Sequence, residues 1–288
     1  MIRVRFWGCR GSVASPGRAT ARYGGNTACV HVVGYDSHEP GAGAHPDNPQ
    51  VVLDGGTGLA LLQSVLMRGL LGRGKGHAHV MLTHFHWDHL IGLPFFTPLF
   101  IPGNKVSFYG ACDQRVQSSI ERLFTSVYSP IKGTEHLAAE LEYRKLDPTG
   151  ETVDGFEVSV ADNRHPGGAL SIRLQYGDRS IVYSTDHEIG DEAIDEKLVE
   201  LARGADLWIM DAQYRPEQLA RHIGWGHSSH IDAVRLALRA KVRKVALFHH
   251  KPDHDDHELD RMGLEAQQEA GDHGLKIVVA RDGLVMDL

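Results

Sequence analysis

Residues 83–89 read Thr-His-Phe-His-Trp-Asp-His and directly follow the apolar run His79-Val80-Met81-Leu82. Three imidazoles and one carboxylate within six residues are costly to hold together unless a cation binds them. Histidine and carboxylate side chains gathered near the end of a strand are ligands that one or two divalent transition metals use. The stretch therefore predicts a metal site.

Size and composition point to a soluble globular protein. The chain has 288 residues, of which 42% are hydrophobic and 23% charged, and we expect a single domain over residues 1–288. The formal charge is −7, and no Lys/Arg-rich run occurs. These features argue against a long nucleic acid as partner, but a small phosphate ester needs only a local positive field.

The location of the protein is predicted from three features. Residues 1–7 alternate like a strand and lack the apolar core of a signal peptide. The most apolar stretch, residues 91–102, contains three prolines and is too short to span a bilayer. Cys9, Cys29 and Cys112 are isolated, which is typical of reduced cysteines. We therefore expect a cytoplasmic protein without a membrane segment.

Short strand-like runs alternate with amphipathic helices, which predicts sheets with helices on their faces. Leucines spaced three and four apart mark the first helix, and Ser229 with Asp232 is typical of a helix start. Residues 34–50 are expected to form an exposed loop with His38 and His45 in solvent. The predicted strands are 2–7, 28–33, 51–54, 79–82, 105–109, 141–145, 156–160, 170–176, 180–184, 206–210, 244–248 and 276–280, and the predicted helices are 57–71, 113–127, 191–203, 229–240 and 256–270.

Further metal ligands are expected at the ends of later strands. His165 precedes one apolar strand, Asp186 follows another, and His249 ends a third. Such positions gather side chains at one edge of a sheet. His250 competes with His249 for the last place, and His187 is expected to orient a neighbour or face solvent.

The ordered set H-x-H-x-D-H, then His, Asp and His, resembles the metallo-β-lactamase superfamily. Residues 6–12, Phe-Trp-Gly-Cys-Arg-Gly-Ser, resemble the opening strand and glycine loop of that family, and Asp54-Gly55-Gly56 resembles its Asp-x-Gly motif. The resemblance covers nearly the whole chain. It implies an α+β fold, a four-layer αββα sandwich with a dinuclear metal site at one edge.

The resemblance also implies which side chains hold the ions. Zinc suits the histidine and carboxylate set best, although manganese or iron would also fit. Asp54 is expected to orient a ligand or a turn. Phe85 and Trp87 are expected to pack in the core, with stacking on a base as the alternative. The implied ligands are His84, His86 and His165 for one ion and Asp88, His89 and His249 for the other, with Asp186 bridging.

Two motifs point to the phosphodiesterase branch of the family. Residues 211–214, Asp-Ala-Gln-Tyr, and 226–229, Gly-His-Ser-Ser, are similar to motifs of tRNA 3′-end nucleases and phosphoribosyl cyclic phosphodiesterases. The resemblance implies hydrolysis of a small, cyclic phosphodiester by metal-bound hydroxide, in which His227 serves the leaving group or grips the phosphate and Asp211 orients it. Asp88 is the third residue implied in catalysis, and a homodimer is the family expectation.

Other functions stay open. Cleavage of tRNA 3′ ends is disfavoured because no Gly/Pro/basic arm is evident. Hydrolysis of a lactone, thioester or β-lactam is a further alternative, and a non-catalytic metal-binding module is another. Residues 129–136 match no known motif and could cap the pocket.

Overall fold

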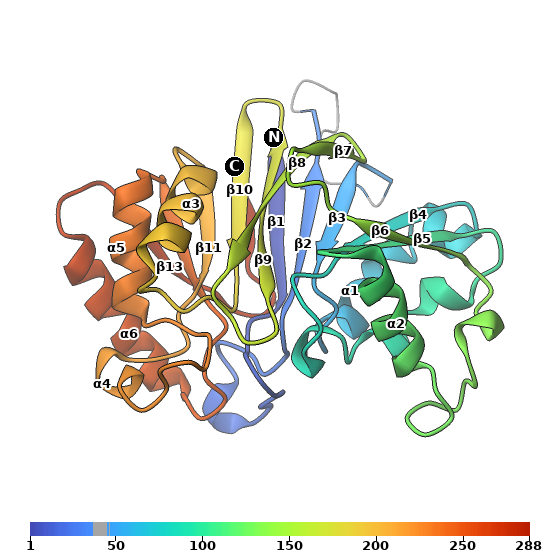
Figure 1. Ribbon diagram of the computed structural model, residues 1–288, viewed down its shortest axis with the longest axis horizontal. Coiled ribbons are helices and arrows are strands. Elements are labelled where there is room, and N and C mark those ends of the chain that lie inside the picture. The colour runs from blue at the N-terminus through green and yellow to red at the C-terminus, as the bar shows by residue number, and fades with distance from the viewer. Residues whose placement is uncertain (37–44, 46) are drawn as a thin grey trace.

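The computed structural model describes residues 1–36, 45 and 47–288 (Figure 1). Two seven-stranded sheets pack face to face, and helices cover both outer faces. This arrangement confirms the expected α+β fold and αββα sandwich. No helix in the described part of the chain has the length and apolar character needed to cross a bilayer.

The first sheet is built mainly from the N-terminal part of the chain. Strands β14 to β3 pair antiparallel, whereas β3 to β6 are parallel. Parallel neighbours send their carboxyl ends to the same edge, so the segment after β4 lies beside the segment after β3. The order across the sheet is β14 (Val285–Asp287), β1 (Ile2–Gly8), β2 (Cys29–Gly34), β3 (Gln50–Leu53), β4 (His77–Met81), β5 (Lys105–Gly110) and β6 (Glu140–Lys145).

The second sheet has the complementary pattern. Strands β13 to β10 are parallel, and β10 to β7 are antiparallel. The carboxyl ends of β10, β11 and β12 therefore meet at one edge. The order is β13 (Lys276–Val279), β12 (Lys244–Phe248), β11 (Leu207–Asp211), β10 (Arg179–Ser184), β9 (Ala169–Tyr176), β8 (Phe156–Asn163) and β7 (Glu151–Val153).

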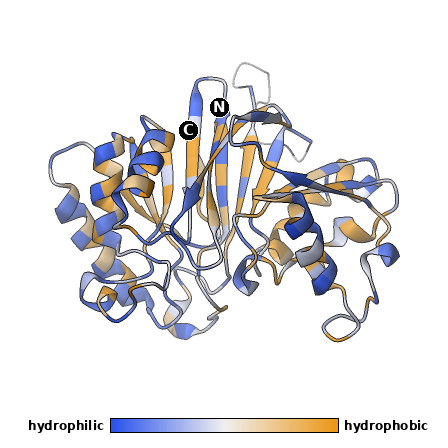
Figure 2. Ribbon diagram, viewed as in Figure 1, coloured by the Kyte–Doolittle hydropathy of each residue, from blue (hydrophilic) through white to orange (hydrophobic). Residues whose placement is uncertain are grey.

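Three apolar layers hold the sandwich together, and Figure 2 shows hydrophobic residues concentrated along the strands. Side chains of both sheets, among them Phe6, Ile172 and Phe248, form the central layer. Helices cover the first sheet with Leu62 and Ile120, and others cover the second sheet through a separate cluster. The helices are α1 (Leu59–Leu66), α2 (Asp113–Leu123), α3 (Glu192–Ala202), α4 (Pro216–Leu219), α5 (His230–Ala240) and α6 (Asp256–Ala270).

Some element bounds differ from the prediction for local reasons. The helix expected over 57–71 ends at Leu66, because glycines follow it, and a 3₁₀ turn (Leu70–Arg73) comes next. The helix expected to reach residue 127 ends at Leu123, and the Thr125 hydroxyl donates to the Arg122 carbonyl. Strands β7 and β14 and helix α4 were not predicted, since each has only three or four residues.

Candidate metal centre

The candidate ligands meet at the edge of the sandwich where the parallel strands end. Residues 84–89 follow β4, and His165 lies in the turn between β8 and β9. Asp186 comes two residues after β10, and His249 comes directly after β12. The first sheet thus supplies the His/Asp motif, and the second sheet supplies the three later side chains.

One group of atoms surrounds a first point. The Nε2 atoms of His84 and His165 lie 3.0 and 3.1 Å from Nδ1 of His86. Oδ2 of Asp186 lies 3.6 Å from Nε2 of His84 and 3.7 Å from Nε2 of His165. These four side chains form a cluster able to hold a metal ion.

A second group surrounds a neighbouring point. Oδ2 of Asp88 lies 3.2 Å from Nε2 of both His89 and His249. The other carboxylate oxygen of Asp186, Oδ1, lies 3.3 Å from Nε2 of His89 and 3.1 Å from Nε2 of His249. Asp186 therefore presents one oxygen to each group, which is the geometry of a bridging carboxylate.

The two groups fit divalent cations by distance and by chemistry. Nitrogen and oxygen ligands about 2.1 Å from a tetrahedral ion lie about 3.4 Å from one another, close to the separations found in both groups. Nε2 of His89 is buried and has no hydrogen-bond partner among the described residues. A buried polar atom without a partner is costly, and an ion at this point would remove the cost.

Electrostatics of the two groups differ. Burial lowers the pKa of His84, His86 and His165, so these imidazoles are neutral at pH 7, as metal ligation requires. Burial also disfavours the charge of His89, but the carboxylates of Asp88, Asp186 and Asp54 raise its pKa well above the ordinary value. In the metal-free protein a proton on His89 thus balances the negative charge of the surrounding carboxylates, and a bound cation would balance it in the metal-loaded protein.

Asp54 holds His89 in one orientation. Its Oδ2 accepts from Nδ1 of His89 at 2.8 Å and from the Tyr183 hydroxyl at 2.9 Å, and its Oδ1 accepts from the Thr83 amide at 2.8 Å. Because Nδ1 of His89 carries the proton in this bond, Nε2 is left as the lone-pair donor that faces the centre. Asp54 therefore lies behind a ligand, where it orients the ring.

Backbone conformation at the centre is unusual. Asp54, Asp186 and His249 have φ angles of 60°, 55° and 59°, in the left-handed region that residues with a side chain seldom occupy. Ser12 also has a φ of 64°, and its amide donates to Oδ2 of Asp88 at 2.8 Å. Strained residues that gather at one place are typical of a functional site.

His227 and Asp211 form a pair beside the two groups. Nδ1 of His227 lies 2.8 Å from Oδ2 of Asp211, and the His227 ring lies 5.4 and 5.0 Å from the rings of His165 and His249. Burial disfavours the charged ring, but the Asp211 carboxylate raises the pKa of His227 to about 9. The amides of Asp186 and Ser228 also donate to Asp211, which fixes the carboxylate.

Other expectations near the centre have mixed outcomes. His250 donates from Nε2 to the Ala280 carbonyl at 2.7 Å and so turns away from the ligand groups. His187 is buried and lies 2.9 Å from Asp195, so it does not face solvent. His45 is exposed as expected, whereas His38 lies outside the described residues.

The packing expected of Phe85 and Trp87 holds only in part. Phe85 packs against the apolar layer beneath α1 and α2. Trp87 is 58% exposed, so the expectation of core packing is wrong for this residue. The reason is local, because Trp87 begins a one-turn 3₁₀ helix (Trp87–His89) whose other two side chains face inward.

Several residues that support the centre escaped the sequence analysis. The Ser12 amide holds Asp88, and the Tyr183 hydroxyl reaches Asp54 from the other sheet. Glu188 accepts from the amides of Gly224 and Gly226, and the Gly226 carbonyl accepts from Nδ1 of His165. Backbone donors carry no sequence signal, and a tyrosine within a strand reads as an ordinary core residue.

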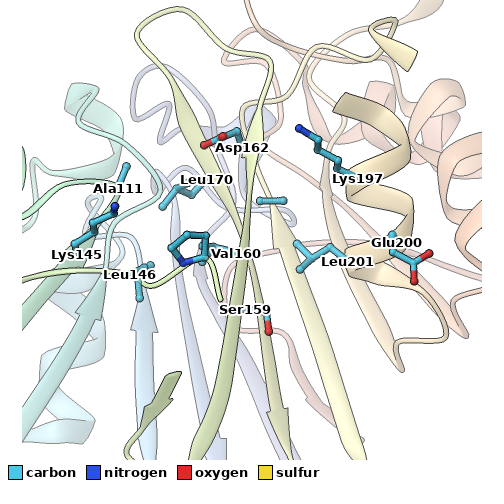
Figure 3. Close-up of a pocket in the computed structure, with 12 residues that line it drawn as sticks. Ala111, Lys145, Leu146, Ser159, Val160, Asp162, Leu170, Lys197, Glu200 and Leu201 are labelled. Atoms are coloured by element: carbon cyan, nitrogen blue, oxygen red, sulfur yellow. The ribbon is translucent and has the colours of Figure 1, made fainter. Parts of the chain in front are cut away.

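A cavity of about 630 Å³ lies between the last strand of the first sheet and helix α3, across β8 (Figure 3). Lys145 and Lys197 stand on its two sides, and Asp162 lies between them (Figure 3). None of the seven candidate ligands lines this cavity. The metal centre is therefore separate from this cavity.

Comparisons with known proteins agree with this geometry. Residues 50–250 match the model of the β-lactamase superfamily domain. A ribonuclease Z of Ignicoccus hospitalis is 30% identical over 62% of this chain and 71% of its own length. Among solved structures, the metallo-β-lactamase fold protein YhfI from Bacillus subtilis has a TM-score of 0.71 at 19% identity and covers 99% of this chain and 98% of its own. A diphosphatase from the PhnP family has a TM-score of 0.62 at 18% identity, over 100% of this chain and 98% of its own.

Proposed function

The chain belongs to the β-lactamase superfamily, and we propose that it is a dinuclear metal-dependent hydrolase of a small, cyclic phosphodiester. The observation that carries the proposal is the His227–Asp211 pair beside the two ligand groups. The thiolate released from a thioester needs no proton donor of this kind, whereas the alkoxide of a lactone does. An alkoxide leaving from phosphorus needs one as well.

The proposed ligands are the seven side chains described above. Two divalent cations, with zinc as the best match and manganese or iron as alternatives, would supply Lewis acidity and a water of lowered pKa. Asp186 divides its oxygens between the two groups, and Asp88 is fixed by the Ser12 amide. The chain thereby holds its negative ligands in place before any substrate arrives.

His227 has the proposed role of proton donor to the leaving oxygen. Asp211 binds Nδ1, which leaves Nε2 of His227 as the atom that can give up a proton. In the metal-free protein burial disfavours the charged ring, but the Asp211 carboxylate outweighs burial and raises the pKa of His227 to about 9. This bond to Asp211 favours the protonated ring that a general acid requires. Asp211 is a positioning residue in this proposal, because it acts only through His227.

Residues 1–288 are proposed to form one domain, since the layer between the sheets contains Ile2 and Leu288 as well as residues of the middle of the chain. The proposed setting is the cytoplasm, where Cys9, Cys29 and Cys112 stay reduced. A homodimer is part of the same proposal.

A nuclease for tRNA 3′ ends is the second candidate. The similarity to ribonuclease Z of Ignicoccus hospitalis favours it. The net charge of −7 and the lack of a Gly/Pro/basic arm in the sequence favour a small substrate instead, because a long nucleic acid needs many phosphate contacts.

The substrate class is tested by turnover of four compounds with protein loaded with zinc or manganese. The compounds are bis-p-nitrophenyl phosphate, a cyclic nucleotide, a lactone and a pre-tRNA. We expect hydrolysis of the first two and its loss after chelation. Turnover of the lactone alone would exclude phosphodiester chemistry, and cleavage of the pre-tRNA alone would establish the nuclease.

The role of His227 is tested by His227→Ala, with exposed His257→Ala on α6 as the control. Proton donation contributes about a hundredfold or more to a rate. A cyclic nucleotide needs that proton, whereas p-nitrophenolate leaves without one. We expect kcat to fall far more for the cyclic nucleotide than for bis-p-nitrophenyl phosphate. An equal fall for both compounds would assign His227 to phosphate binding, and unchanged rates would exclude it from the reaction.

A further inference from the structure

A second cavity, of about 460 Å³, lies between helix α2 and the segment that follows β4. Phe85 and Trp87 line it, and these residues alternate with the ligands His84, His86 and Asp88 along the chain. Its far wall is α2, and Arg115 of that helix donates to the carbonyl of Gly167, two residues after His165. No candidate ligand lines the cavity, but its aromatic wall belongs to the segment that carries three of them, and Arg115 links its other wall to the loop of His165.

The wall formed by α2 carries a polar stripe. Arg115, Ser118, Ser119 and Arg122 are spaced three, four and seven residues apart, so they share one face of the helix, and all four line the cavity. The opposite face of α2 is apolar and buried. Among the described residues neither arginine has an ion-pair partner, although most arginines of this acidic chain have one.

The other wall is aromatic. Trp87 is 58% exposed, and its ring lies 6.0 Å from that of Tyr128 in an edge-to-face arrangement. Phe85 lies beneath the Arg115 guanidinium at 5.7 Å. The exposed indole of Trp87 offers a flat face on which a base could stack.

We infer that this cavity is a substrate subsite that takes a nucleobase on Trp87 and a second phosphate on the Arg115–Arg122 stripe. Guanidinium and hydroxyl donors suit phosphate oxygens, and indole faces suit bases. No carboxylate lines the cavity to compete with an anion. The inference rests on the proposed function, which places the scissile phosphate at the metal centre. The substrate class is then a nucleoside phosphodiester that carries a second phosphate.

Binding of matched nucleotides tests the subsite without turnover. The probes are adenosine 3′,5′-bisphosphate, 3′-AMP and 5′-AMP, titrated by calorimetry into the metal-loaded full-length protein. In the inferred arrangement one phosphate of each probe occupies the metal centre, and only the bisphosphate carries a second phosphate for the arginines. We expect the bisphosphate to bind about tenfold or more tightly than either monophosphate. Equal affinities for the three would overturn the inference.

Two substitutions locate the contacts. Arg122→Gln should bring the affinities of bisphosphate and monophosphates together, because Arg122 makes no other ion pair in the described chain. Exposed Arg68→Gln removes the same charge outside the cavity and should retain the difference. Adenosine compounds should quench tryptophan emission in the wild type but not in Trp87→Phe. An unchanged affinity ratio in Arg122→Gln would refute the phosphate contact, and quenching that persists in Trp87→Phe would refute the stacking.

The proposed function fails separately from this inference. If the metal-loaded protein binds the bisphosphate preferentially but hydrolyses neither bis-p-nitrophenyl phosphate nor a cyclic nucleotide, the subsite stands and the phosphodiesterase does not. If it hydrolyses both compounds and binds all three nucleotides equally, the phosphodiesterase activity is supported and the subsite is refuted.

Discussion

Asp54→Asn should weaken metal binding although Asp54 is not a proposed ligand. Asp54 is fully buried and accepts from His89, Tyr183 and Thr83. An asparagine has only one side-chain oxygen, so its NH2 group would face donors in either orientation: the His89 ring and the Tyr183 hydroxyl in one, the Thr83 amide in the other. Loss of a partner that orients a metal-bound histidine costs about 10–100-fold in affinity. This range corresponds to about 1.4–2.7 kcal/mol.

Tyr183→Phe is the matched control for this prediction. It removes one donor to the same carboxylate but leaves the charge and the bond to Nδ1 of His89. The unfolding free energy of the metal-free protein should fall by about 1–3 kcal/mol, because a hydrogen bond to a buried charged group is lost. Metal affinity should change by less than about threefold, since the ring of His89 keeps its orientation.

Competition with a coloured chelator at pH 7 gives the metal affinity, and urea unfolding of the metal-free proteins gives the stability. The two variants should differ in effect: Asp54→Asn should lower metal affinity, and Tyr183→Phe should lower mainly the unfolding free energy. If Asp54→Asn binds metal as tightly as the wild type, Asp54 does not set the orientation of His89. If Tyr183→Phe loses as much affinity as Asp54→Asn, the effect is general loosening of the site.

Three further outcomes are expected from urea unfolding. In the metal-free protein the pKa of His227 is raised to about 9, so the protonated ring stabilises the fold fully below pH 6.5, and this stabilisation is lost as the pH rises through 9. The difference in unfolding free energy between wild type and His227→Gln should therefore shrink by about 3 kcal/mol over that pH range. Burial lowers the pKa of His250 to about 3, so the unfolding free energy falls as the pH drops below 6.5. Between pH 6.5 and 5, His250→Gln should lose about 2 kcal/mol less unfolding free energy than the wild type. An equal loss would exclude His250 as the cause. Phe156→Ala, in the layer between the sheets, should cost about 3–5 kcal/mol, whereas Leu264→Ala, 66% exposed, should cost less than about 1 kcal/mol, and similar costs would contradict the assigned packing.

Local sequence patterns predicted the fold well where the chain repeats a period over many residues. Helix α6 has the predicted bounds, and the strands that precede Asp186 and His249 lie where their apolar runs indicated. Three-residue strands and the four-residue helix α4 escaped, because so few residues show no period. The resemblance to a known family, rather than periodicity, supplied the sandwich and the pairing of its sheets.

The candidate site was predictable to the extent that its side chains are chemically distinctive. His165, Asp186 and His249 stand at strand ends with groups that bind metals. Contacts that depend on tertiary structure were not predictable, as with the Ser12 amide on Asp88 and the hydroxyl of Tyr183 on Asp54. The exposure of Trp87 was also missed, because a tryptophan within a run of metal ligands gives no sign of its direction.

The two ligand groups draw on both halves of the sandwich, and this has a consequence for the apoprotein. Neither sheet alone carries a complete set, since each group combines side chains that follow β4 with side chains from the second sheet. Ions at the centre would therefore be bound by residues from both sheets. A free-ion concentration one hundred times the dissociation constant would raise the unfolding free energy by about 2.7 kcal/mol. Metal depletion in the cell would then make the protein more susceptible to proteolysis as well as inactive in the proposed reaction.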